Sequence, residues 1–330
     1  MNCDPLPLLR RGTESQLRGE LDQAETCYRQ ILESDPHHAT ALNNLGYLLG
    51  QRGESEAALD LFDRSLTLAP ERVTTWVNRG LVLAACGEYD AARKSLERAI
   101  ELDPDHALAW NNLAKLHLSL GARSQAETAF RHALRVDPDD TKVARNLAAL
   151  LAARGEYGEA LLLLERSLQR TPEAADAWAQ LGALRFVRQD YASAIEALEK
   201  ALELEPQQAF AWHHLAMVEA ARGRPEVARR LLEALLQVHP GHPAELDLAV
   251  VCLSLGDPAA ALERLRRVRA RDPESMRAAW YQSLAAAEVE GSDPSELLRT
   301  MRHIASSAEP EFARRAQQWL KVYEAQRVSA

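Results

Sequence analysis

Four asparagines recur at a constant interval along the chain, and their side chains could recognise a polypeptide backbone. The register continues into a glutamine and a histidine, so the row comprises Asn44, Asn78, Asn112, Asn146, Gln180 and His214. A carboxamide carries both donors and an acceptor, so it can pair with a peptide unit in both directions. A row of them on one surface would hold an extended chain whatever its side chains are. The alternative is that asparagine is merely common at this position and stays hydrated.

Two further groups of side chains are expected beside this row. The middle of the chain offers Asn111, Lys115, Lys142 and Arg145, which form a basic spot for an acidic side chain. The later part offers Phe186, Phe210 and Met217, with Val187 and His213 beside them. These apolar groups would accept hydrophobic side chains of a ligand whose backbone the asparagines hold. Ordinary packing between neighbouring helices is the alternative interpretation of the apolar group.

The sequence predicts no catalytic centre, no metal site and no cofactor. The paired histidines His213 and His214 are neighbours on a predicted helix, so their side chains diverge by about 100° and do not share a metal easily. Most other histidines fall in predicted turns, and no HExxH, GxSxG, GxGxxG or phosphate-binding loop is present. The carboxylates are spread over turns and outer helices, whereas a catalytic pocket needs groups that converge.

An internal repeat with a period of about 34 residues must position all of these side chains. Prolines mark it at Pro36, Pro70, Pro104, Pro138, Pro172, Pro206 and Pro240, and Pro273 follows one residue early. Glycines mark it at Gly19, Gly53, Gly87, Gly121, Gly155 and Gly223, with Gln189 in the place of one glycine. Tryptophans Trp76, Trp110, Trp178, Trp212 and Trp280 lie at multiples of this period from one another, which places Trp280 in the same register.

Each unit is predicted to form two antiparallel helices. In the unit from Ala107 to Asp140, apolar residues follow helical spacing over 108–120 and again over 124–136. Glycine between the two segments supplies a left-handed turn, and proline ends the second helix. Small residues in the first helix, such as Gly46 and Gly182, face an alanine of the second, so the two helix axes can approach closely.

These residues together resemble the tetratricopeptide repeat. The pattern in one unit is carried by Trp110, Leu113, Ala114, Gly121, Ala126, Phe130, Ala133 and Pro138. The resemblance implies an all-α fold, an α-solenoid in which antiparallel helix pairs form a right-handed superhelix. It predicts an array over residues 1–310, of about nine repeats with the first and ninth degenerate. Residues 311–330 are expected to form a C-terminal capping helix and tail, since an end repeat would otherwise expose an apolar face.

The degenerate repeats depart from the pattern in identifiable places. The first, over residues 5–38, has a weak first helix. The ninth keeps Trp280 and the turn glycine Gly291, but Glu296 stands where the small alanine is expected.

The resemblance also suggests how the asparagines function. In tetratricopeptide arrays the first helix of each pair lines the concave side, and the row resembles the asparagine ladder in the repeats of O-GlcNAc transferases, which holds a peptide backbone. No sequence remains here for a glycosyltransferase domain. Asn112 with Lys142 also resembles part of the carboxylate clamp of co-chaperone repeats. The rest of that clamp is missing, because Val77, Leu81 and Asn146 stand where a lysine, an asparagine and an arginine are expected.

Composition narrows the remaining alternatives. The 330 residues are 47% hydrophobic and 26% charged, with a net charge of −9, which argues against nucleic acid as a partner. No long apolar run predicts membrane insertion. The N-terminal residues lack a secretory signal and the cysteines form no CxxC, so a cytoplasmic location is expected. The arginine- and alanine-rich composition suggests a bacterial source.

Five arginines between Arg264 and Arg271 are expected to be a solvated helix face.

The sequence therefore favours a non-catalytic scaffold that binds an extended peptide or a disordered segment in a concave groove. A second hypothesis is a substrate-recognition or regulatory subunit that joins a separate protein-modifying enzyme. A third is a self-assembling scaffold, in which copies of the chain form a homo-oligomer.

Overall fold

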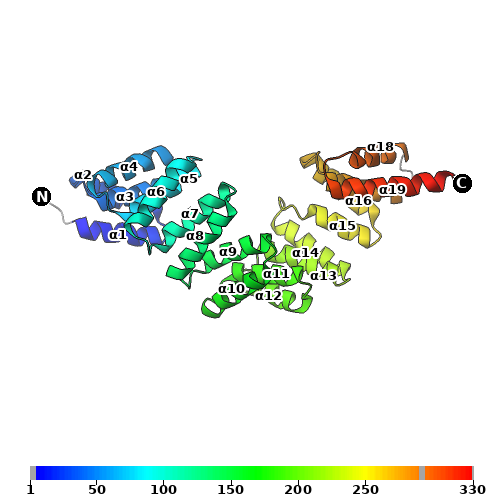
Figure 1. Cartoon of the computed structure of the whole chain (residues 1–330), viewed down its shortest axis with the longest axis horizontal. Helices are drawn as coiled ribbons and strands as arrows, with labels where there is room; N and C mark the ends of the chain where they lie inside the picture. Colours follow the sequence, from blue (N-terminus) through cyan, green and yellow to red (C-terminus); the bar gives the residue numbers. More distant parts are fainter. Residues whose placement is uncertain (1–4, 290–293, 329–330) are drawn as a thin grey trace. The chain divides into compact units, whose positions relative to one another are not determined.

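Antiparallel helix pairs follow one another along the chain, as the glycine and proline positions predict (Figure 1). The computed structural model describes residues 5–289 and 294–328, and α-helices are the only regular elements in these two ranges. Contacts divide the chain into two units, Met1–Leu163 and Leu164–Ala330. The all-α array of antiparallel helix pairs expected from the sequence is thus confirmed.

The first unit contains α1 to α9, and the boundary between the units falls within α10. The helices are α1 (Pro5–Leu17), α2 (Leu21–Ser34), α3 (Ala39–Gln51), α4 (Ser55–Leu68), α5 (Val73–Ala85), α6 (Tyr89–Leu102), α7 (Ala107–Ser119), α8 (Arg123–Val136), α9 (Thr141–Ala153) and α10 (Tyr157–Arg170). The first helix is a full α1 of 13 residues, although the sequence predicts a weak one.

The second unit continues the same alternation. Its helices are α11 (Ala175–Val187), α12 (Tyr191–Leu204), α13 (Ala209–Ala221), α14 (Pro225–Val238), α15 (Glu245–Ser254), α16 (Pro258–Arg271), α17 (Met276–Glu288), α18 (Pro294–Ala305) and α19 (Pro310–Val328). The predicted turn glycine Gly291 and the side chain of Glu296 lie outside the described residues. A helix does occupy the segment expected to cap the array, and its capping role stays a prediction.

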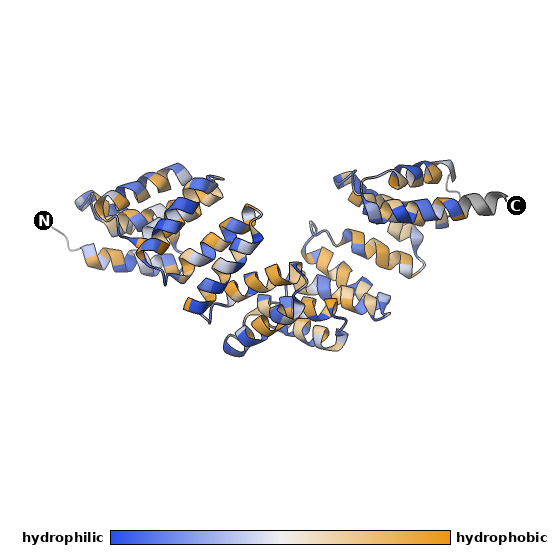
Figure 2. Cartoon of the chain, viewed as in Figure 1, coloured by the Kyte–Doolittle hydropathy of each residue, from blue (hydrophilic) through white to orange (hydrophobic). Residues whose placement is uncertain are grey.

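Apolar and polar residues occur together on the helices of both units (Figure 2), and the buried apolar residues form the core clusters. In the first unit the two helices of a repeat approach closely where the first carries glycine. A Cβ added at Gly46 would lie 2.9 Å from the Phe62 ring, so the missing side chain is what allows this contact. Phe62 itself is fully buried.

The turn inside each repeat depends on a left-handed residue. Seven glycines adopt φ between 71° and 84° there: Gly19, Gly53, Gly87, Gly121, Gly155, Gly223 and Gly256. Gln189 adopts φ 63° at the equivalent place, although it has a Cβ. The left-handed conformation costs a residue with a side chain about 1–2 kcal/mol.

Gln189→Gly is therefore expected to stabilise the second unit. Removing the left-handed strain gains about 1–2 kcal/mol, and the larger entropy of glycine in the unfolded chain returns about 0.5–1 kcal/mol of this. The net gain of about 0.5–1 kcal/mol can be measured by urea denaturation followed by circular dichroism. Arg188→Gly is the control, since Arg188 has φ −82° and only the entropy cost remains. Equal destabilisation by both variants would contradict the strain argument.

Four tryptophans donate a hydrogen bond to the turn that joins one repeat to the next. The indole N–H of Trp76 donates to the carbonyl of Pro70 over 2.8 Å. The same bond joins Trp110 to Pro104, Trp178 to Pro172 and Trp212 to Pro206, in each case at the same spacing along the chain. Proline and tryptophan recur together because each pair closes one turn.

Trp280 does not occupy this place, so its predicted register is wrong. It stands one position further from Pro273 than the other tryptophans do from their prolines, and α17 begins at Met276 because the Ser275 side chain accepts from the Ala278 N–H. Trp280 consequently points into the cluster that contains Met301 and Ile304, and it is only 8% exposed.

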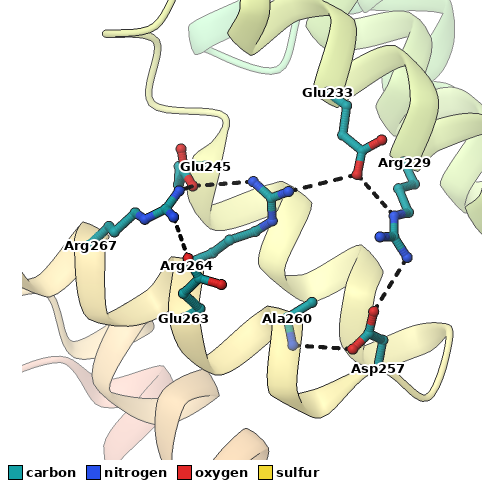
Figure 3. A network of polar contacts seen from close by, with 8 residues as sticks. All are labelled: Arg229, Glu233, Glu245, Asp257, Ala260, Glu263, Arg264 and Arg267. Atoms are coloured by element: carbon teal, nitrogen blue, oxygen red, sulfur yellow. Dashed lines mark hydrogen bonds and ion pairs between the residues drawn. The ribbon is translucent and has the colours of Figure 1, made fainter.

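The arginine-rich stretch on α16 is not the solvated face that the sequence predicts, because two of its arginines form ion pairs. Arg264 contacts Glu233 on α14 over 3.7 Å and Glu245 on α15 over 3.3 Å (Figure 3). Arg267 lies 3.8 Å from Glu245 and also pairs with Glu263. Glu245 is buried, so this network ties α14, α15 and α16 together and is not a freely solvated face.

Candidate functional site

A cavity of about 380 Å³ lies on the first-helix face of the first unit. Residues from α3, α5 and the start of α7 line it, together with two residues of the turns that precede α5 and α7. The lining consists of Asn43, Asn44, Tyr47, Arg72, Thr74, Val77, Asn78, His106 and Leu108. Two members of the predicted asparagine row, Asn44 and Asn78, are therefore brought together here.

The asparagines in this cavity are linked to one another by hydrogen bonds. The Nδ2 of Asn78 donates to the Oδ1 of Asn43 over 3.1 Å, and the Nδ2 of Asn43 donates to the Oδ1 of Asn44 over 3.0 Å. This chain fixes all three carboxamides before any ligand arrives. It leaves the Nδ2 of Asn44 and the Oδ1 of Asn78 as one donor and one acceptor for a ligand.

Asn43 connects the row, and the prediction from sequence missed it. A usable signal existed, because Asn43 precedes the predicted Asn111 by two full repeats. Arg72 and His106 were also missed, since they lie in turns just before α5 and α7. No motif marks these turn residues as part of a surface.

The other predicted polar residues of the first unit lie outside the cavity lining. Asn111 and Asn112 are buried on α7, and the Oδ1 of Asn111 has no hydrogen-bond partner. Asn146 and Arg145 on α9 are half-buried, whereas Lys115 and Lys142 are exposed. The structure thus places these side chains on consecutive first helices without joining them into one pocket.

Two turn residues of the cavity wall are fixed by hydrogen bonds to neighbouring helices. The Nη2 of Arg72 donates to the Thr40 hydroxyl over 2.9 Å. The Nδ1 of His106 accepts from the Ala109 N–H, so the proton of the neutral ring resides on Nε2. The Arg72 side chain is therefore oriented by α3, and that of His106 by the first turn of α7.

The predicted apolar stretch of the second unit is divided by its packing. Phe186 packs into the core, where its ring centroid lies 6.1 Å from that of Tyr191. Phe210 is 44% exposed, and Val187 is exposed as well. Met217 on α13 is half-buried. The alternative of ordinary packing applies to Phe186, while Phe210 stays available on the surface.

His214 and Gln180 continue the asparagine register with buried polar atoms. The Nδ1 of His214 lies 2.8 Å from the Phe210 carbonyl oxygen, and the two rings are 4.0 Å apart. Burial lowers the pKa of His214 below its ordinary value, which keeps the ring neutral. The Oε1 of Gln180 is buried without a hydrogen-bond partner.

An ionic chain lies beside His214 and spans three first helices. The Nε2 of His213 on α13 lies 2.8 Å from the Oδ2 of Asp247 on α15, and Arg277 on α17 donates to the other oxygen over 2.7 Å. Burial favours the neutral acid, but the bond from His213 and the charge of Arg277 together outweigh it. The pKa of Asp247 is consequently lower than usual.

Neither a metal-binding cluster nor a membrane-spanning helix occurs in the described residues. No group of three or more His, Cys, Asp or Glu side chains in residues 5–289 and 294–328 is arranged to hold a metal ion. Within the same ranges, no helix is both long and apolar enough to cross a membrane. Cys27, Cys86 and Cys252 are free thiols, and Cys3 lies outside the described residues.

Family models match much of the chain. The model described as tetratricopeptide repeat matches residues 175–208, and a second one of that description matches 207–274. The chain belongs to the tetratricopeptide-repeat family. Residues 4–177, more than half of its length, belong to the family described as the cilia and flagella-associated protein 70 C-terminal domain. No curated protein matches the sequence.

Solved tetratricopeptide-repeat structures share the fold at low sequence identity. A chain of the APC/C hetero-tetramer Cut9-Hcn1 is 21% identical with a TM-score of 0.65, and the match covers 84% of this chain and 55% of that one. The type IV pilus biogenesis factor PilW is 22% identical with a TM-score of 0.58, and the match covers 62% of this chain and 96% of PilW. PilF of Pseudomonas aeruginosa is 24% identical with a TM-score of 0.55, and the match covers 63% of this chain and 94% of PilF. This chain therefore spans about half the length of the Cut9-Hcn1 component.

Within this tetratricopeptide-repeat protein, the cavity is built only from first helices and the turns that lead into them. The second helices do not contribute to its lining. In the family the first helix of each pair lines the concave side of the array. The asparagines, Arg72 and His106 thus belong to the side of the repeat that the family leaves free of second helices.

Proposed function

We propose that this chain is a non-catalytic scaffold whose first-helix face binds an extended peptide or a disordered protein segment. The tetratricopeptide-repeat fold is that of a protein–protein interaction scaffold and is typically non-catalytic. The observation that supports the specific role is the cavity with its chain of three hydrogen-bonded asparagines. In this cavity Asn44 presents a donor and Asn78 presents an acceptor, and the two match the carbonyl and the N–H of a peptide unit.

The proposed ligand is extended because the row of carboxamides is spread over several helices. Asn44, Asn78, Asn112 and Asn146 lie on α3, α5, α7 and α9, one per repeat. A helical ligand satisfies its own backbone groups, whereas an extended one presents them to such a row. Exposed Lys115 and Lys142 would add contacts to acidic side chains along the same path. Phe210, in the second unit, would contact an apolar side chain.

Replacing Asn78, Asn112 and Asn146 together by alanine is expected to remove ligands of this face. Each lost hydrogen bond weakens binding by about 0.5–1.5 kcal/mol, so the combined loss of affinity is about ten- to a thousandfold. The measurement is affinity capture from the native cell with wild-type and variant protein, each checked for native helix content by circular dichroism.

A matched control keeps the first-helix face intact. Gln23→Ala with Gln30→Ala removes two exposed carboxamides from the second helix α2 and should leave captured partners unchanged. Partners lost only with the asparagine variant are ligands of the first-helix face. Undiminished capture of every partner by a folded asparagine variant would reject the proposal.

A further inference from the structure

Arg72 bonds to a neutral hydroxyl, whereas many arginines in the described part of the chain pair with a carboxylate. Arg79 pairs with Asp63 over 2.7 Å, Arg131 with Glu159 over 2.9 Å, and Arg52 with Glu25 and Asp22. In the part of the chain that the structure describes, Arg72 donates to the Thr40 hydroxyl and forms no ion pair. Its Nε is buried and has no hydrogen-bond partner. A half-buried guanidinium therefore faces the cavity with its charge unpaired.

The remaining polar groups of the cavity add to this preference for an anion. His106 presents the N–H of its Nε2, because its Nδ1 already accepts a hydrogen bond. Asn44 presents its Nδ2, because its Oδ1 accepts from Asn43. None of the nine lining residues is acidic, although the chain has 48 acidic and 39 basic residues. The cavity is thus a locally positive, donor-rich place in an acidic protein.

The walls restrict the form in which the anion arrives. Tyr47, Val77 and Leu108 are apolar parts of the lining, and Leu108 is exposed. A carboxylate that is carried on a peptide can bring an apolar neighbour to these walls, whereas a free ion cannot. Guanidinium and carboxylate have matching planar geometry, and a bond between them is strongest where water is partly excluded.

We propose that Arg72 binds a carboxylate of the extended segment, so that the cavity selects ligands with an acidic group beside an apolar side chain. This inference rests on the proposed function and adds the chemistry of the ligand to it. The partial resemblance to a carboxylate clamp involves Asn112 and Lys142 on α7 and α9. The site at Arg72 is a different one, because it lies in the turn before α5 and is completed by His106 and Asn44.

Defined peptides test the proposal. The probes are fluorescein-labelled, unstructured peptides with a common Gly-Ser background and one central Leu-Glu, Leu-Gln or Leu-Lys pair, each blocked by a C-terminal amide. A fourth peptide ends in Leu with a free carboxylate. Binding to the full chain is measured by fluorescence anisotropy. The two carboxylate sources are thereby separated, because the Glu peptide has only the side chain and the fourth has only the terminus.

We expect either the Leu-Glu peptide or the peptide with the free C-terminal carboxylate to bind about tenfold more tightly than the Leu-Gln peptide. The Arg72→Gln variant should lose this preference. Arg72→Lys should restore part of it, because it keeps the charge but not the planar fork. Arg98→Gln, on the second helix α6, makes the same change of net charge outside the cavity and should keep the full preference.

Each other outcome contradicts a specific statement. Equal binding of the Gln and carboxylate peptides, or an unchanged preference in folded Arg72→Gln, overturns the role of Arg72 and leaves the peptide-binding face standing. Equal losses in Arg72→Gln and Arg98→Gln show a general charge effect and also overturn it. Failure of wild-type protein to bind any of the peptides overturns both this inference and the proposed function for such ligands.

Discussion

Gly182→Leu is expected to lower the free energy of unfolding of the second unit by about 3 kcal/mol. A Cβ at this position would lie 2.5 Å from the Cγ of Leu198 and 3.0 Å from the carbonyl oxygen of Ala194. Leu198 is fully buried, so it has no free space to move into, and the Ala194 oxygen belongs to the helix backbone. The helices α11 and α12 must separate to accommodate the larger side chain. Urea denaturation of the variant measures the loss.

Gly158→Leu is the matched control for this prediction. Gly158 lies in α10, and a Cβ there would meet no atom within 4 Å. The same substitution should therefore stabilise the protein by about 0.5–1 kcal/mol, because leucine has the higher helix propensity. Opposite signs for the two variants are expected, and a neutral Gly182→Leu would show that close approach of α11 and α12 is not required.

Asp247→Asn is expected to destabilise the second unit by about 2 kcal/mol at neutral pH. The carboxylate accepts one bond from His213 and one from Arg277, and bonds to charged groups contribute about 1.5–3 kcal/mol each when half-buried. Asparagine keeps the shape and one acceptor but removes the charge that both partners face. The loss is measured by urea denaturation, with Asp60→Asn as the exposed control, for which a much smaller effect is expected.

The effect of Asp247 also has a defined pH dependence. Its folded pKa is lowered from 3.8, so its ionised form contributes stability that is complete above the unfolded value and declines as the pH falls through the folded value. The difference between wild type and Asp247→Asn should thus narrow as the pH falls below 3.8, the ordinary value of the Asp247 carboxyl. A difference that widens below pH 3.8 would contradict the assignment of a lowered pKa.

The helix pairs could be predicted because their boundaries depend on local residues. Glycine is the residue that adopts a left-handed φ without strain, so a glycine at fixed spacing predicts the turn directly. Gln189 occupies the same conformation because the helices on either side impose it, and its own preference is outweighed. The register of Trp280 was mispredicted because it was counted from the other tryptophans; its distance from Pro273, one residue longer than in the other repeats, already indicates the shift.

The candidate site could be predicted only for the residues that share one helical register. Asn44 and Asn78 line the cavity because the same position of successive first helices faces the same side. Arg72 and His106 lie one repeat apart at the residue before successive first helices, but the residue type changes there from repeat to repeat, so the position does not mark a binding surface. The pairing of Arg264 with Glu233 and Glu245 was missed for a related reason, because spacing along α16 says nothing of charges on α14 and α15.

The bonds between tryptophan and proline give the chain built-in optical reporters. Trp76 and Trp110 belong to the first unit, while Trp178 and Trp212 belong to the second, and all four are half-buried at turns. Opening of a turn frees the indole N–H for water and shifts the fluorescence emission to longer wavelength. Trp280 is shielded within its cluster and should resist an aqueous quencher. Replacing all tryptophans of one unit by phenylalanine, including Trp280 and Trp319 in the second, would let local opening of the other unit be followed separately, without an added dye.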